Sequence, residues 1–263
     1  MALLIGCGFV PSVLSRCETV GASAGAAYGG SRLTEKERIL LLSNPSNSKN
    51  RSSGSSEKVS RTKNRKEVSN ANMISRNGIK YQINNSATYG VYLKILNKAL
   101  DQLDICIGKW RRVFVIRFDL HQRWHTANNS MVSKFRKNLV RRIERKYELF
   151  EVGFVWVREQ ERAKSQHYHM ALFLDGDKIN HSASIGKIIR EAWVAVKAGN
   201  SVHIPKNCYY NVTDEDSKQE VIYRLSYLAK QRGKGYRPPQ TKDYSVSRLC
   251  MPPRYDFNTG ESC

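Results

Sequence analysis

Hydrophobic residues recur at helical spacing along the second half of the chain. This periodicity predicts four helices, over 88–104, 130–150, 184–197 and 216–232. In the second of these, Val132, Phe135, Leu139 and Ile143 share one side, and many Lys and Arg residues occupy the other. That segment is therefore predicted to be a basic amphipathic helix.

Between these helices lie short runs of β-branched and aromatic residues. They predict strands over 113–118, 152–157 and 168–174, and a short strand over 208–212. The polar turn Arg162–Gln166 is expected to join the second and third strands as a hairpin. The resulting order, helix then β-α-β-β-α-β-α, predicts an α+β fold with an antiparallel or mixed sheet and helices packed on it. It is compatible with a ferredoxin-like split β-α-β core.

The hydrophobic pattern also divides the chain. Residues 1–85 are rich in small and basic polar residues and predict a weakly structured basic N-terminal region, with one short helix over 34–42. Residues 86–240 are expected to form the folded domain. Residues 241–263 are expected to be an irregular tail.

The charge of the chain indicates which kind of partner the protein binds. With 263 residues, the chain carries 44 Lys and Arg against 23 Asp and Glu, a formal net charge of +21. Such an excess indicates a polyanionic partner, and nucleic acid is the first choice. The six cysteines form no CxxC pair, which argues against a zinc finger or a disulfide framework and favours a reducing cytoplasm. No stretch is long and apolar enough to span a membrane.

The most informative motif is His167-Tyr168-His169, which precedes the apolar run 170–174. Alternate residues of a strand share a face, so the two imidazoles are predicted to lie on one side, about 6.6 Å apart along the strand. Two converging neutral imidazoles can bind one divalent metal ion. The pattern His-hydrophobic-His on a buried strand is typical of one nuclease superfamily.

A carboxylate would complete the site. The predicted hairpin places Glu159, at the end of its strand, beside the histidines, and a His-His-Glu set with open positions suits a catalytic metal ion. Gln160 or Glu161 is an alternative third ligand, and Asp119 and His121, after the first strand, are further candidates.

The last predicted helix carries Tyr223, Tyr227 and Lys230 on one stripe. A tyrosine hydroxyl, with a pKa of about 10, is a poor nucleophile. It can attack phosphorus when a metal ion polarises the phosphate and a cation stabilises the developing charge, which is the role predicted for Lys230. The alternative is that the tyrosines only cover the edge of the core.

These motifs resemble those of HUH endonucleases, the rolling-circle replication initiators: His167-Tyr168-His169 is similar to the HUH motif, and Tyr227-Leu228-Ala229-Lys230 to the Y-x-x-K motif. More narrowly, residues 110–235 resemble the YagK/YfjJ C-terminal domain family, which includes replication proteins of filamentous phages (inoviruses) and prophage-like elements. The residues that carry the resemblance are Arg117-Phe118-Asp119-Leu120, Val157-Arg158-Glu159-Gln160, His167–Leu172, Ala192-Trp193, Val202-His203-Ile204-Pro205 and Tyr223–Lys230.

The resemblance implies a ferredoxin-like nuclease core that uses Mg²⁺ or Mn²⁺ to nick single-stranded origin DNA, leaving a 5′-phosphotyrosine and a free 3′-OH primer. It makes His167, His169 and Glu159 the metal ligands, Tyr227 the nucleophile and Tyr223 an alternate nucleophile. No P-loop motif is present, so a host helicase and polymerase are expected partners, in the cytoplasm of a bacterial host cell.

Two alternatives are a non-catalytic DNA-binding regulator of a prophage element and a relaxase or transposase on the same core. Basic residues offer contacts to the DNA backbone, with a merely solvated surface as the alternative. The candidates are Arg136, Lys137, Arg141, Arg232 and Lys234.

Overall fold

The computed structural model describes residues 67–85, 89–160, 165–179 and 181–251. Most of the predicted N-terminal region, including the helix expected over 34–42, lies outside these residues. The hairpin turn predicted over 162–166 is described only from residue 165 onward.

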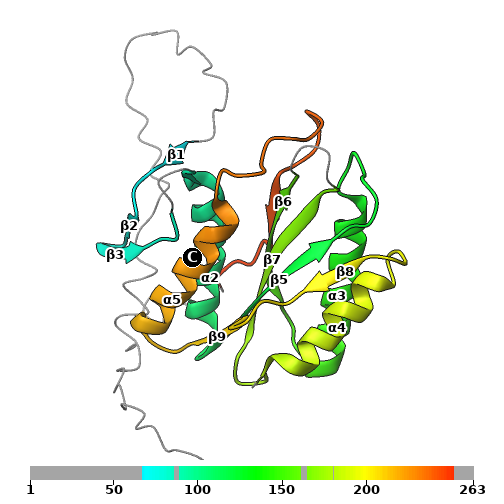
Figure 1. The fold of residues 1–263 in the computed structure, drawn as a ribbon. Helices are drawn as coiled ribbons and strands as arrows, with labels where there is room; N and C mark the ends of the chain where they lie inside the picture. Colours follow the sequence, from blue (N-terminus) through cyan, green and yellow to red (C-terminus); the bar gives the residue numbers. More distant parts are fainter. Residues whose placement is uncertain (1–66, 86–88, 161–164, 180, 252–263) are drawn as a thin grey trace, which may run out of the picture.

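The centre of the fold is a sheet in which every described pair of strands is antiparallel (Figure 1). Its strands run in the order β10-β6-β7-β5-β8, and β9 pairs with the other half of β5. Their bounds are β5 Val113–His121, β6 Gly153–Glu159, β7 His167–Asp175, β8 Ser201–His203, β9 Tyr209–Val212 and β10 Tyr244–Val246.

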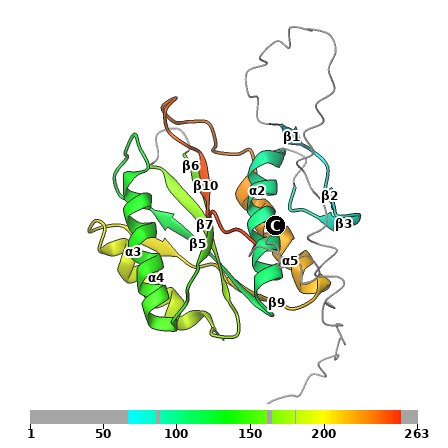
Figure 2. The same ribbon diagram turned by 180° about the vertical axis from the view of Figure 1, so that it is seen from behind.

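Helices cover both faces of this sheet. Helices α3 (Ser130–Tyr147) and α4 (Ser182–Val194) pack on one face, and α2 (Leu93–Lys109) and α5 (Glu215–Ser226) on the other, as Figures 1 and 2 show from opposite sides. The predicted α+β class is confirmed. Helix α3 joins β5 to β6, and β7 inserts between these two strands, which is a split β-α-β connection. The narrower assignment to the core of HUH nucleases stays a prediction.

Alternation along the strands explains the two layers. In β5, Phe114, Ile116 and Phe118 point to the α3 and α4 side, whereas Val113 and Val115 point to the α2 and α5 side. Because both faces are covered, the strands are almost continuously buried. The same alternation places the polar odd-numbered residues at the end of β5 on the α2 and α5 side.

Residues 67–85 correct the predicted domain boundary. They form β1 (Val68–Ser69), which pairs with β4 (Val91–Tyr92), and a hairpin of β2 (Met73–Arg76) and β3 (Ile79–Gln82). Tyr81 and Ile83 are buried among α2 and α5. The folded domain therefore begins before residue 86. It also ends later than predicted, because β10 lies in the expected irregular tail and pairs with β6.

A buried ionic cluster fastens this hairpin to the helices. Asp104 of α2 accepts a hydrogen bond from Arg76 Nε at 2.6 Å, and its other oxygen lies 3.2 Å from Lys218 Nζ of α5. The Lys218 side chain has no exposed surface. One carboxylate thus neutralises two cations from two other elements. Within the described part of the chain, no helix is sufficiently long and apolar to cross a membrane.

We expect Asp104→Ala to reduce the free energy of unfolding by about 3–5 kcal/mol, because it leaves Lys218 buried beside no carboxylate. Denaturant-induced unfolding measures this loss. The matched control is Asp101→Ala, which removes a carboxylate that also binds Arg76 but is 40% exposed. Its expected cost is about 0–1 kcal/mol. Equal costs for the two variants would contradict the proposed role of the buried pair.

Candidate metal centre

The pairing of three strands brings the predicted metal ligands together. Glu159, the last residue of β6, is the register partner of His167, the first residue of β7. His169 is paired with Val157 on β6 and with Asp119 on β5. All these polar side chains therefore belong to one end of the sheet, on the face that α2 and α5 cover.

Glu159, His167 and His169 form the one group of three potential metal ligands found among the described residues. One donor atom from each lies within 4.8 Å of the others. Glu159 Oε2 is 3.4 Å from His167 Nε2 and 3.1 Å from His169 Nε2. The predicted set of two imidazoles and one carboxylate is thus assembled in space. Of the alternatives, Gln160 is engaged by Arg158 and His125, and Glu161 lies outside the described residues.

His169 supplies an observation that fits a metal ion. Its Nε2 atom is buried and, despite its closeness to Glu159, has no partner with hydrogen-bond geometry in the described structure. An unsatisfied buried nitrogen is costly. A cation between this nitrogen, His167 and Glu159 would satisfy it, and one carboxylate and two imidazoles are ligands for divalent transition metals.

Asp119 holds His169 in position. The Oδ1 atom of Asp119 lies 2.6 Å from His169 Nδ1, whereas Glu159 lies beside the other ring nitrogen, Nε2. Burial alone would raise the pKa of Asp119, but the hydrogen bond and charge of His169 outweigh burial and lower it. A carboxylate on Nδ1 leaves Nε2 as the metal-binding nitrogen. Asp119, itself a candidate ligand, is therefore the hydrogen-bond partner of His169, a predicted ligand.

His169 itself stands between two carboxylates. Burial by itself would lower the pKa of His169, but the hydrogen bond to Asp119 and the charges of Asp119 and Glu159 prevail and raise it. The neighbouring His121, another candidate ligand, stacks on the ring of His167 at 5.6 Å between centroids. Burial and the charge of His167 lower the pKa of His121.

The position of Lys234 differs from the predicted exposed contact to a DNA backbone. Its side chain is fully buried, and its ammonium donates a hydrogen bond to Glu159 Oε1 at 2.5 Å. Burial lowers the pKa of Lys234, against the opposing charge of Glu159. The lysine is therefore a partner of Glu159, the predicted third ligand, and offers no exposed charge to a DNA backbone. Gly233 has a φ of +69°, a left-handed conformation that favours glycine, and this turn brings the chain into van der Waals range of Glu159.

Tyr227 lies against this centre. Its ring is 5.4 Å from the ring of His169, centroid to centroid, and meets it edge to face. Arg117 Cζ lies 4.4 Å from the Tyr227 centroid, and Lys230 Nζ lies 5.1 Å from it. Burial lowers the pKa of Lys230, partly offset by the charge of Glu159. The structure thus brings Tyr227 and Lys230 to the predicted ligands.

The helix that carries these residues is shorter than predicted. Helix α5 ends at Ser226, and Tyr227–Ala229 forms a 3₁₀ turn, η1, after which Lys230 leaves helical geometry. Tyr223, the predicted alternate nucleophile, lies on α5 itself and is 46% exposed. No contact between Tyr223 and the three ligands is found in the described structure. Its role as a nucleophile stays a prediction.

The other candidate DNA contacts lie elsewhere. Arg136, Lys137 and Arg141 belong to α3, which covers the opposite face of the sheet from the metal ligands. Lys137 and Arg141 are exposed, whereas Arg136 packs its guanidinium 5.0 Å from the centre of the Phe154 ring. Arg232 is exposed in the segment that follows η1. Whether any of these residues contacts DNA stays a prediction.

Arg117 is the functional candidate that the sequence reasoning missed. Its Nη2 donates to both oxygens of Asp119, at 3.1 and 3.2 Å, while its guanidinium covers Tyr227. A signal for it exists in the sequence. Arg117, Asp119 and His121 alternate along one strand just as His167 and His169 do, so all of them share a face once the two strands pair.

A comparison with known protein families assigns this domain to one family. The family model of the YagK/YfjJ C-terminal domain matches residues 73–243, which is more than half of the chain. The chain belongs to this family. The match starts at β2 and ends just before β10, so it includes the N-terminal hairpin and every residue of the candidate centre. Neither a curated protein nor a solved structure gives a significant match.

We expect Asp119→Asn to weaken Mn²⁺ binding about 10- to 100-fold, because His169 loses the carboxylate that orients it. Isothermal titration calorimetry measures the affinity, and circular dichroism verifies folding. The control is His203→Gln, since His203 also approaches Asp119, at 3.5 Å, but is 63% exposed. Unchanged affinity in Asp119→Asn would contradict this arrangement, and a parent protein that binds no Mn²⁺ would refute the metal centre itself.

Proposed function

We propose that this protein is a metal-dependent endonuclease that nicks and rejoins single-stranded DNA, acting as a rolling-circle replication initiator. The observation that carries the proposal is the position of His169. The Nε2 atom of His169 faces Glu159 in the predicted ligand set, and the His169 ring also contacts Tyr227, the predicted nucleophile. A DNA-binding regulator would need neither the ligands nor a tyrosine beside them.

In this mechanism Glu159, His167 and His169 hold the metal ion. When bound, the ion supplies Lewis-acid polarisation of the scissile phosphate. The ligands do not need further orientation, since Asp119 already fixes His169 and Lys234 fixes Glu159. The resemblance points to Mg²⁺ or Mn²⁺, and the two imidazoles favour Mn²⁺.

Tyr227 performs the substitution at phosphorus. Its hydroxyl oxygen forms a bond to the phosphorus while the bond from phosphorus to the 3′ oxygen breaks. The phenolic proton leaves Tyr227, and the departing 3′ oxygen takes up a proton to become a 3′-OH. The product is a 5′-phosphotyrosine, which keeps the energy of the broken ester for rejoining.

Two cations support this step. The guanidinium of Arg117 and the ammonium of Lys230 both lie near the Tyr227 ring, where they stabilise the phenolate that forms as the proton leaves. Lys230 and Arg117 are therefore proposed as the two fixed positive charges beside the nucleophile, and the phenolic proton passes to solvent.

The assignment to replication rests on the family resemblance and on charge. A net charge of +21 suits a phosphodiester substrate. Proposed partners are single-stranded origin DNA and a host helicase and polymerase, in the cytoplasm of a bacterial host cell. The relaxase and transposase alternatives use the same chemistry on other DNA, so the sequence that is cut will distinguish them.

A covalent adduct tests the nucleophile directly. The protein is incubated with Mn²⁺ and a randomised single-stranded oligonucleotide library, digested with nuclease and trypsin, and analysed by mass spectrometry. Trypsin separates the two tyrosines, because Tyr223 falls in peptide 219–224 and Tyr227 in peptide 225–230. We expect a nucleotide mass on 225–230 and none in Tyr227→Phe. A modified 219–224 peptide alone would reassign the nucleophile to Tyr223.

Removal of the metal ion separates cutting from binding. We expect EDTA to abolish cleavage and adduct formation while binding of single-stranded DNA persists, because the basic surface is unaffected. Titration back should restore cleavage at a lower concentration of Mn²⁺ than of Mg²⁺, since imidazole nitrogens bind Mg²⁺ poorly. Cleavage that continues in EDTA would refute the metal-dependent mechanism.

A further inference from the structure

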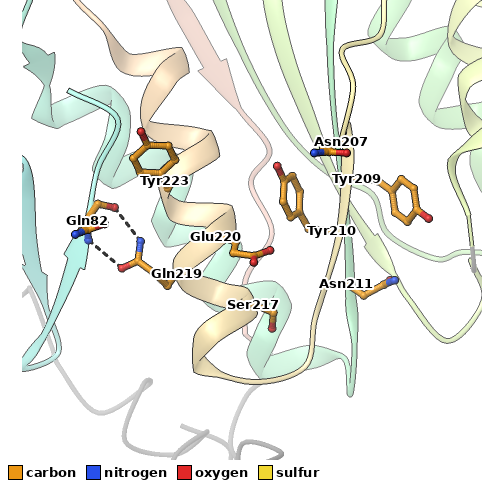
Figure 3. A pocket seen from close by; sticks show the side chains of 9 residues that line it. All are labelled: Gln82, Asn207, Tyr209, Tyr210, Asn211, Ser217, Gln219, Glu220 and Tyr223. Atoms are coloured by element: carbon orange, nitrogen blue, oxygen red, sulfur yellow. Dashed lines mark hydrogen bonds between the residues drawn. The ribbon is translucent and has the colours of Figure 1, made fainter. Parts of the chain in front are cut away.

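An open cavity of about 750 Å³ lies between α5 and β9. In Figure 3, Tyr210 reaches from β9 toward α5, which carries Tyr223 and Glu220, while Tyr209 and Asn211 point to the other side of their strand. Tyr209 stacks there on Phe114 at 5.3 Å between centroids. Where the cavity faces α5, its walls are therefore formed by the rings of Tyr210 and Tyr223 and the carboxylate of Glu220.

The lining of this cavity is unusual for so basic a protein. Among the residues that the structure describes, no Lys or Arg lines it, and the polar groups are amides, hydroxyls and Glu220. These walls favour an uncharged ring over a phosphate. The volume lies within the range of about 300–1,000 Å³ that holds small ligands. Aromatic faces with uncharged polar groups and one carboxylate suit a nucleobase, because bases stack on aromatic rings and their amino groups donate to carboxylates.

Hydrogen bonds within the protein fix the walls of the cavity. Arg224 donates a hydrogen bond to the hydroxyl of Tyr210 at 3.0 Å and further bonds to the carbonyls of Lys206 and Asn207. At the other end, the side chain of Gln219 both accepts from and donates to the backbone of Gln82 (Figure 3). Its amide is therefore occupied. In the described structure no hydrogen bond or ion pair engages the carboxylate of Glu220.

The chain connects the walls of the cavity to Tyr227 in two ways. Tyr223 precedes Tyr227 by four residues, about 6 Å along a helix, and 46% of Tyr223 is exposed. The backbone N–H of Arg117, whose side chain covers Tyr227, donates to the carbonyl of Cys208, just before Tyr209. A nucleotide seated in the cavity can therefore belong to the strand whose phosphate lies at Tyr227.

We propose that this cavity binds one unpaired nucleobase with an exocyclic amino group, stacked on Tyr223 and Tyr210 and hydrogen-bonded to Glu220. The inference rests on the proposed function in one respect, that the base belongs to the strand that is cut. Tyr223 then contributes its ring, whereas the two-tyrosine expectation required its hydroxyl.

Binding without cutting tests the site. Fluorescence anisotropy measures the affinity of labelled oligo(dC) and oligo(dT) of equal length, in the Tyr227→Phe background with EDTA. We expect tighter binding of oligo(dC). Tyr223→Ala should weaken oligo(dC) binding about 5- to 150-fold, the loss of one stacked base, whereas Tyr223→Phe keeps the ring and should restore it. The control Phe150→Ala removes an exposed aromatic ring far from the cavity.

Glu220→Gln tests the hydrogen bond. Removing a negative charge strengthens binding of any DNA, so the informative quantity is the ratio of the two affinities. We expect the preference for oligo(dC) to disappear in Glu220→Gln. An unchanged preference, a Tyr223→Ala variant that matches Phe150→Ala, or an equal loss in Tyr223→Phe would each overturn the proposal. Because no step requires cleavage, a failure of the nicking hypothesis leaves these outcomes readable.

Discussion

The antiparallel register of β7 between β5 and β6 is the constraint on which the candidate centre depends. It sets His167 opposite Glu159 and His169 opposite Asp119. A shift of one residue would turn both histidines toward α3 and α4, into a layer of apolar side chains. The hydrophobic residues of β7 oppose such a shift, because Tyr168, Met170 and Leu172 are completely buried on that side. Core packing therefore fixes the position of the ligands.

Charge pairing is the second requirement of the site. Burying carboxylates is costly unless each is paired. Here Glu159 is paired with Lys234 and Asp119 with Arg117, so each carboxylate is neutralised by its own cation. Such a centre repels an incoming phosphodiester less than two unpaired carboxylates would, which agrees with a substrate that carries negative charge at the point of reaction.

The helices, the long strands and the grouping of Glu159, His167 and His169 could be predicted from the sequence, because long periodic segments and an i, i+2 histidine pair are local signals. The short strands β8 and β10 and the hairpin of β2 and β3 could not, since each strand has only three or four residues and its place in the fold depends on contacts with distant segments. The burial of Lys234 was unpredictable for the same reason. A lysine in a Gly-rich basic segment looks solvated until its partner, Glu159, is known to lie beside it.

The end of α5 shows how tertiary contacts decide what two similar tyrosines do. The Ser226 hydroxyl donates to the carbonyl of Tyr223 and accepts from the N–H of Asn84, which competes with continued helix. Beyond η1, the N–H of Gln231 donates to the carbonyl of Gly90 and so ties the chain to the segment before β4. The bonds to Asn84 and Gly90 come from residues far away in sequence. They hold Tyr227 against His169 and leave Tyr223 one turn back at the open cavity, so residues of the same type and spacing meet different surroundings.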